Sequence, residues 1–280
     1  MSSYNFDKGH MDNGLSPRPV LARNGGIQGI AGDNGLRQEA LQTDSATVNR
    51  LLKQLPLALL KRLQPQTRKV ALSGGEYIYR PDEEIDWIYF PETTAISELQ
   101  ILEDGRTIEV SITGRESAVG LQAMYWPGPS ANWVQVCTPG TAVKIKRDAL
   151  RKESRGMDWV NSLFHSTIGS YIAHISQKVA CNAHHTVEER FSTWLLLLHD
   201  RCAAKRLKLT QEHIARVLGV YRPSITCIAQ DMRERGLIEY VRGNIVIIDR
   251  EGLIERSCNC YADLSAMYNE RVPEMNVRWA

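Results

Sequence analysis

The sequence has no apolar run long enough to cross a membrane. Its longest candidate, Trp194 to Leu198, is far shorter than the roughly 18 residues that a spanning helix needs. The amino terminus also lacks a basic segment followed by an apolar stretch, so we expect no secretory signal. These absences argue against a membrane protein, a membrane partner and a secreted protein.

Cysteine is absent from the first 136 residues, and the whole chain of 280 residues has six. Such a sparse and one-sided set is not typical of a disulfide framework. We therefore expect reduced thiols in a cytoplasmic protein.

The motifs of common enzymes are missing as well. The chain has no phosphate-binding glycine loop, no Gly-x-Ser-x-Gly and no His-Glu-x-x-His. The glycines of "GRESAVG" lie between predicted strands, where a turn explains them. The composition, with 43% hydrophobic and 24% charged residues, is that of an ordinary globular protein, and we expect neither catalysis nor a cofactor.

The length allows two ordinary domains with a tail at each end. Residues 1–45 hold seven glycines and few large apolar side chains, which predicts a disordered tail, and 271–280 is predicted as a second tail. The segment "VNRLLKQLPLALLKRL" repeats leucine at helical spacing and is interrupted by Pro56. This pattern predicts two short helices or one kinked helix.

Residues 46–155 are predicted to form the first domain, an antiparallel sandwich or barrel. Short runs rich in Val, Ile, Tyr and Trp alternate with turn signals such as Pro81-Asp82 and Pro139-Gly140. The pair Asp104-Gly105 is the strongest hairpin signal of the chain. The predicted strands are "EYIYR", "IDWIYF", "AISELQILE", "TIEVSI", "NWVQV" and "AVKIK".

A long helix is predicted over residues 156–185, because apolar residues recur there every three or four positions. Such a stripe can pack on the chain's own β-domain or on the same helix of a second copy. We favour the second arrangement, a homodimer, since a two-fold pair of helices closes the stripe. The predicted dimer residues are Val160, Phe164, Ile168, Tyr171, Ile175 and Val179.

Residues 186–270 are predicted to form a second domain. It opens with Thr186 and Glu189 at the spacing of a capping box. Further on, Thr210 is a predicted helix N-cap, Gly219 ends that helix, and Arg222-Pro223 begins the next one. Two short helices joined by a glycine turn are typical of a helix-turn-helix, whose second helix enters the major groove of DNA.

The second of these helices has two distinct faces. Its apolar side is predicted to consist of Ile225, Ile228, Ala229 and Met232. Its opposite side carries Pro223, Cys227 and Gln230, with Arg222 at the leading end.

The segment "LIEYVRGNIVIID" predicts a small hairpin around Arg242, the wing of a winged helix. Residues 205–245 contain eight basic and four acidic side chains, a local net charge of +4 that exceeds the +2 of the whole chain. Positive charge concentrated in this way favours phosphate contacts. The alternative is a helical hairpin that stacks on the β-domain and solvates its arginines.

Several motifs together resemble one protein family over about residues 46 to 270. They are "CNAHHTVEER" before the helix-turn-helix, "CNCY" after it, and "YIYRPDEEIDWIYFPE" and "LEDGRTIEV" in the β-rich region. With the domain order, they resemble the Crp/Fnr superfamily of bacterial transcription factors. The resemblance implies an α+β fold with a cyclic-nucleotide-binding-like antiparallel β-roll, a dimerisation helix and a C-terminal winged helix-turn-helix. It also implies a homodimer on an inverted-repeat operator of double-stranded DNA, with RNA polymerase as a partner.

The resemblance further implies which residues contact DNA. Arg222 matches the arginine that contacts a guanine edge, whereas Pro223 and Cys227 depart from the residues of the cyclic-AMP receptor type. The full predicted DNA-binding set is Thr210, Gln211, Tyr221, Arg222, Pro223, Ser224, Thr226, Cys227, Gln230 and Arg242.

The predicted effector is unknown and is not cyclic AMP. Leu121 follows Gly120 where cyclic-AMP binders have an acid, and Ser130-Ala131 replace an arginine-serine pair. Without that arginine a buried phosphate would lack its charge-assisted partner. The amino-terminal cysteines that hold an iron–sulfur centre in oxygen-sensing relatives are also missing.

Two alternatives to a regulator of this kind remain. The first is metal or redox sensing, since Cys181 and His185 lie one helical turn apart. Against it, cysteine is commonly buried as a small hydrophobe and a histidine at a helix end often caps carbonyls, so we predict no metal. The second is an interaction module with a non-functional helix-turn-helix. The candidate sensing residues are Cys181, His184, His185, Cys202, Cys258 and Cys260.

Overall fold

The computed structural model describes residues 47–202 and 204–269. All described residues belong to one compact unit. Both predicted tails, 1–45 and 271–280, lie outside the described residues. Among the described helices, none is both long and apolar enough to span a membrane.

Two short helices, α1 (Arg50–Lys53) and α2 (Leu57–Leu63), begin the described chain. Pro56 is the N-cap of α2, because its missing N–H rules out helix continuation through this position. The predicted break at Pro56 therefore separates two helices. The buried Asn49 side chain caps α1 and donates to the carbonyl oxygens of Pro91 and Ser117, both at 2.9 Å.

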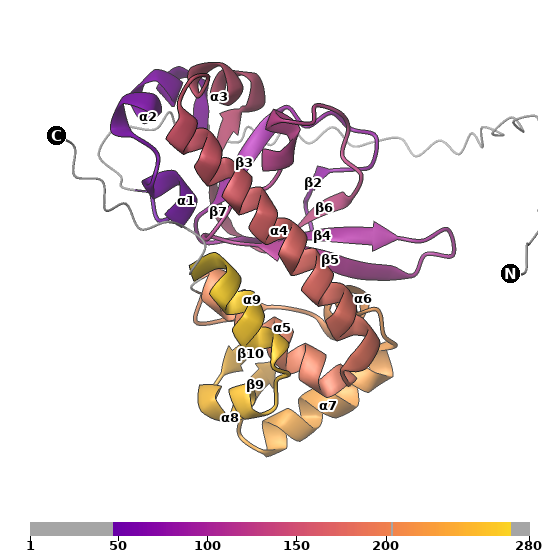
Figure 1. Ribbon diagram of the computed structural model, residues 1–280. Helices are drawn as coiled ribbons and strands as arrows, with labels where there is room; N and C mark the ends of the chain where they lie inside the picture. Colours follow the sequence, from indigo (N-terminus) through magenta and orange to yellow (C-terminus); the bar gives the residue numbers. More distant parts are fainter. Residues whose placement is uncertain (1–46, 203, 270–280) are drawn as a thin grey trace, which may run out of the picture. The chain divides into compact units, whose positions relative to one another are not determined.

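Seven antiparallel strands form two sheets in the region after α2 (Figure 1). The first sheet has the order β1-β7-β3 and the second β2-β6-β4-β5. Six strands coincide with the predicted runs, whereas β1 was not predicted and forms through its pairing with β7. Their bounds are β1 (Thr67–Leu72), β2 (Tyr77–Tyr79), β3 (Trp87–Pro91), β4 (Ala95–Ile101), β5 (Thr107–Thr113), β6 (Trp133–Thr138) and β7 (Gly140–Lys146).

The predicted hairpin at Asp104-Gly105 is confirmed as the connection between β4 and β5. Gly105 has φ +83°, a conformation that side chains with a Cβ rarely adopt. The Leu102 N–H donates to the Arg106 carbonyl at 2.8 Å and closes the loop.

Helices α1, α2, α3 (Arg147–Glu153) and the first half of α4 (Asp158–His184) contribute buried residues to the core of the β-domain. Here the structure corrects the predicted dimer stripe. Val160, Phe164 and Ile168 are buried in this core and are therefore not available to a second chain. The first half of the predicted stripe packs on its own β-domain, the arrangement that the sequence left as the alternative.

The remaining elements follow α4. Helix α5 (Val187–Cys202) begins with the predicted capping box, since the Thr186 N–H donates to Glu189 Oε2 at 2.8 Å and the Glu189 N–H to Thr186 Oγ1 at 3.3 Å. The later elements are β8 (Leu207–Lys208), α6 (Gln211–Leu218), α7 (Arg222–Glu234), β9 (Ile238–Val241), β10 (Asn244–Ile247), α8 (Arg250–Glu255) and α9 (Cys260–Asn269).

A second core joins these elements to the β-domain. Leu99 and Ile112, from β4 and β5, are buried in the same cluster as Trp194 of α5 and Ile225 of α7. The turn at Gly219 also packs closely on β5, because a Cβ there would lie 3.3 Å from the Ile108 side chain. The helix-turn-helix is therefore held against the β4–β5 hairpin.

Candidate nucleic-acid interface

Helices α6 and α7 form the predicted helix-turn-helix. The His213 N–H donates to Thr210 Oγ1 at 3.1 Å, which confirms the predicted N-cap of α6. Gly219 ends α6 with φ +65°, and Pro223 lies in the first turn of α7, where a missing N–H costs nothing. Local sequence alone accounts for the turn between the two helices.

The two faces of α7 are arranged as predicted. Ile225, Ala229 and Met232 are buried against the second core, and Ile228 is partly buried. Tyr221 is 86% exposed at the N-cap of α7. The residues on the opposite side of α7 are exposed; they are Arg222, Pro223, Ser224, Thr226, Cys227 and Gln230.

A groove runs between the start of α6, α7 and the strand β9. It has a volume of about 190 Å³, and Thr226 Oγ1 donates to Gln211 Oε1 across it at 2.8 Å. The sequence did not single out Arg233 and Tyr240, which also line it. Arg233 follows Gln230 by three positions on the same helical face, so the spacing could have found it.

The predicted wing is confirmed. Strand β10 pairs with both β8 and β9, and β9 and β10 are joined by a two-residue turn at Arg242 and Gly243. Both turn residues have positive φ, +49° and +74°, as a type I′ turn requires. This turn exposes the Arg242 side chain at the tip of the wing.

The basic side chains counted in this region divide into two groups. The Arg216 guanidinium donates to Gln135 Oε1 at 3.2 Å, and Arg235 pairs with Asp231 at 2.8 Å. These two arginines therefore serve internal contacts. The exposed basic residues that remain are Lys205, Arg206, Lys208, Arg222, Arg233 and Arg242.

A buried carboxylate connects α4 and α5 to the β-domain. Glu109 of β5 is fully buried and pairs with Lys178 of α4 at 3.1 Å. It also accepts from Ser97 Oγ at 2.6 Å and from the Trp194 indole N–H at 3.0 Å. One carboxylate thus joins β4, α4 and α5.

The helix α6 has its own contact with the β-domain through His213. The His213 ring lies 3.4 Å from Cys137 Sγ, measured from Nε2. Burial, and then the nearby Arg216 charge, lower the pKa of His213 to about 4. The ring is therefore neutral near pH 7.

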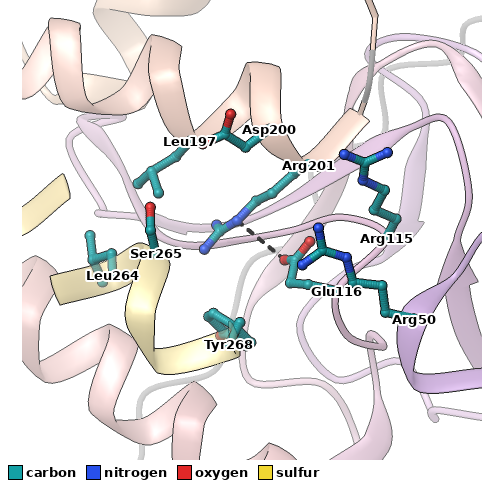
Figure 2. A pocket seen from close by; sticks show the side chains of 9 residues that line it. All are labelled: Arg50, Arg115, Glu116, Leu197, Asp200, Arg201, Leu264, Ser265 and Tyr268. Carbon is teal, nitrogen blue, oxygen red and sulfur yellow. Dashed lines mark ion pairs between the residues drawn. The ribbon is translucent and has the colours of Figure 1, made fainter. Parts of the chain in front are cut away.

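A separate polar pocket of about 170 Å³ lies between α1, α5 and α9 (Figure 2). Arg201 pairs with Glu116 at 3.2 Å and also donates to the Ile112 carbonyl oxygen. Arg50 and Arg115 lie beside Glu116 in this pocket. The Glu116 carboxylate partly offsets the positive charge of the arginines.

The segment compared above with cyclic-phosphate sites includes Leu121, Ser130 and Ala131. Leu121 begins a short 3-10 helix that ends at Met124. The buried Ser130 hydroxyl donates to the Asn132 carbonyl at 2.8 Å, and Ala131 is exposed. Close by, the buried Glu98 accepts hydrogen bonds from Tyr171 at 2.7 Å and Asn132 at 3.0 Å.

The other predicted residues are also placed by the structure. Of the dimer set, Tyr171 bonds Glu98, Ile175 is partly buried, and Val179 is 65% exposed. Of the sensing set, His184 is exposed and Cys202 Sγ donates to the Leu198 carbonyl. The other four residues, Cys181, His185, Cys258 and Cys260, come together.

Comparison with known proteins agrees with this architecture. Residues 69–155 match the cyclic nucleotide-binding domain family, and residues 189–256 match the Crp-like helix-turn-helix domain family. These matches indicate a transcription regulator that binds DNA through a helix-turn-helix. The members of this family are regulators of transcription and not enzymes.

Among curated proteins, the chain is similar to the CRP-like cAMP-activated global transcriptional regulator of Mycobacterium tuberculosis. They are 25% identical over 207 residues, which cover 71% of this chain and 91% of the relative. The chain belongs to the Crp/Fnr family of transcription regulators.

Two solved structures show the same fold. FixK2 from Bradyrhizobium japonicum has a TM-score of 0.59 at 19% identity, over 69% of this chain and 98% of that chain. The c-di-GMP responsive global regulator CLP of Xanthomonas campestris has a TM-score of 0.56 at 14% identity, over 69% of this chain and 99% of that chain.

Proposed function

We propose that this chain is a homodimeric, sequence-specific regulator that binds an inverted-repeat operator in the cytoplasm and acts on RNA polymerase there. The observation that carries the proposal is the exposed, polar side of α7 with a basic wing beside it. A helix of this size fits the major groove, and the exposed wing arginine is proposed to contact a neighbouring phosphate.

Dimerisation is proposed on the face of α4 that points away from its own domain. Exposed residues recur along it in alternating steps of four and three, the heptad spacing of a coiled-coil seam. Ile172 is 57% exposed, and a Cβ at Gly169 would meet nothing within 4 Å, so a second helix can approach closely. The proposed seam consists of Ser162, His165, Gly169, Ile172, Ser176, Val179 and Ala183.

Arg222 is proposed to read a guanine, because its fork matches the O6 and N7 acceptors. Thr210, Gln211, Ser224, Thr226 and Arg242 are proposed to contact phosphates or bases, and Tyr221 and Gln230 to line the same surface. Pro223 and Cys227 carry no strong side-chain donor, so the operator differs from one that is read by charged residues at these positions.

The effector is proposed not to be cyclic AMP, although the mycobacterial relative is cAMP-activated. Glu98 and Glu109, two buried carboxyl groups, lie on the strands that contact α4. Burial raises the pKa of Glu98, so negative charge is disfavoured at that position. A phosphate bound there would need an arginine that the segment lacks. Calorimetry with cyclic AMP tests this point, and micromolar binding would contradict it.

The operator is tested by selecting fragmented genomic DNA on the purified full chain and sequencing what is retained. We expect an inverted repeat whose half-sites lie about one helical turn of 10–10.5 base pairs apart. Arg222→Ala should then weaken binding to that operator by about 1–3 kcal/mol and leave non-specific binding nearly unchanged.

The matched control is Arg235→Ala, which removes an arginine that pairs with Asp231 at the other end of α7. It should leave operator preference intact. A library with no enriched sequence, or equal losses for both variants, would show that α7 does not read DNA.

A further inference from the structure

Four side chains capable of binding a metal converge at the end of α4. Cys181 and His185 come from this end, and Cys258 and Cys260 come from the segment that begins α9. One ligand atom of each residue lies within 4.8 Å of every other. The three cysteines are buried and His185 is partly buried.

The distances fit one tetrahedral ion. With Zn–S bonds of about 2.3 Å and Zn–N bonds of about 2.0–2.1 Å, two sulfurs lie about 3.8 Å apart and a sulfur and a nitrogen about 3.5 Å apart. In the structure Cys181 Sγ lies 3.6 Å from Cys258 Sγ, and Cys260 Sγ lies 3.5 Å from His185 Nδ1. These two pairs are thus close to the separations that a shared ion imposes, and the other pairs lie within 4.8 Å.

The surroundings stabilise thiolates as well. The Gln177 amide donates to Cys260 Sγ at 3.1 Å. Thr193 Oγ1 accepts from the Cys258 N–H at 3.3 Å, so its one hydrogen is available for Cys258 Sγ, which lies 3.1 Å away. Donors around metal-bound ligands orient them and tune the metal.

A buried cysteine is commonly just a small hydrophobic residue. That explanation suits Cys202, whose thiol donates to a carbonyl of its own helix. It does not account for three sulfurs and an imidazole nitrogen directed at one point. Three thiolates and one histidine form a closed set of four ligands, which is the pattern of structural zinc sites.

We propose that Cys181, His185, Cys258 and Cys260 bind one zinc ion, or another thiophilic divalent metal of the same geometry. The ion fastens the start of α9 to the end of α4, and Thr193 connects the site to α5. Beside the site, the Arg190 guanidinium bonds Asn182 at 3.4 Å and the Leu218 carbonyl, the last residue of α6, at 3.2 Å. The metal therefore stabilises the region where α4 meets the helix-turn-helix, whichever operator the protein binds.

The experiment measures metal in the full chain, purified in reductant without chelators and then loaded with zinc and dialysed. We expect about one zinc per chain by mass spectrometry of the elements, as a four-ligand site requires. Cys258→Ser and Cys260→Ser should lose it. Cys202→Ser and Cys227→Ser are the matched controls and should keep it, because these cysteines lie outside the cluster.

Cobalt substitution of the unaltered chain gives a second readout that does not depend on any variant folding. Tetrahedral cobalt with thiolate ligands gives intense visible bands and a sulfur-to-metal charge-transfer band, and His185→Ala should shift them. A spectrum of hydrated cobalt, the absence of bound zinc after loading, or a Cys181–Cys258 disulfide in freshly isolated protein would each overturn the proposal.

Discussion

The two halves of α4 are held to the same chain by different chemistry. The first half buries Val160, Phe164 and Ile168 in the core of the β-domain. The second half buries polar residues, above all His174 and Lys178, which face partners on other elements. An apolar face tolerates small shifts, whereas a buried polar contact requires one geometry. The first half therefore supplies stability, and the second half specifies how α4 meets β5 and α5.

The largest expected effect is on the apolar half. Phe164→Ala should lower the free energy of unfolding by about 4 kcal/mol, because a fully buried ring leaves a cavity. Urea denaturation measures the loss. As a control, the exposed Ser162→Ala on the same helix should change it by less than about 0.5 kcal/mol. A small loss for Phe164→Ala would mean that the first half of α4 is not anchored in this core.

The next effect is on the polar half. Lys178→Met should destabilise the chain by about 3 kcal/mol, since removal of one partner leaves the Glu109 carboxylate buried without its cation. The remaining bonds from Ser97 and Trp194 keep the loss at the lower end of the expected range. The double variant Lys178→Met with Glu109→Gln should recover part of it. Additive losses in this cycle would show that the two side chains do not interact.

A smaller effect depends on pH. Burial, followed by the charges of Arg201 and Lys178, lowers the pKa of His174 well below its ordinary value of 6.5. Its neutral form is needed in the fold, so the stability it supports is present above pH 6.5. That stability is lost as pH falls toward the lower folded pKa, at no more than about 1.4 kcal/mol per pH unit.

Denaturation midpoints at pH 7.5 and 5.5 measure this loss for the wild type and for His174→Gln. The wild type should lose more stability than the variant over this interval. His213, with its pKa lowered to about 4, contributes in the same direction in both proteins, so it cancels in the comparison. Equal losses in the two proteins would contradict the role of His174.

The smallest effect on folding belongs to the exposed face of α4. Ile172→Ser should change the unfolding of the single chain by less than about 0.5 kcal/mol, because this side chain is mostly exposed. If this face is the dimer seam, the same variant should raise the dissociation constant of the dimer measured by ultracentrifugation. If the dissociation constant is unchanged, the dimer seam lies on another surface of the chain.

The sequence predicted those parts of the fold that depend on local chemistry. The hairpin at Gly105, the capping box at Thr186 and the turn at Gly219 each follow from a few neighbouring residues, and each is confirmed. The alternation of faces on α7 was also visible from spacing alone.

What it could not predict depends on residues far apart in the chain. The predicted partner of Val160, Phe164 and Ile168 was wrong because periodicity identifies an apolar face and not the surface that covers it. The convergence of Cys181 with Cys258 needs the fold of the intervening residues, as does the use of Arg216 to bond Gln135. Local charge counts therefore overstate the number of arginines that face DNA.

The Glu109 carboxylate also limits how α4 can move. It holds Lys178 and the Trp194 indole at the same time, so α4 and α5 share one anchor on β5. An α-helix advances about 1.5 Å per residue, so a slide of one residue along its axis would have to be taken up by the Lys178 side chain or lengthen its contact with Glu109. A signal that shifts α4 lengthwise therefore acts against this shared anchor.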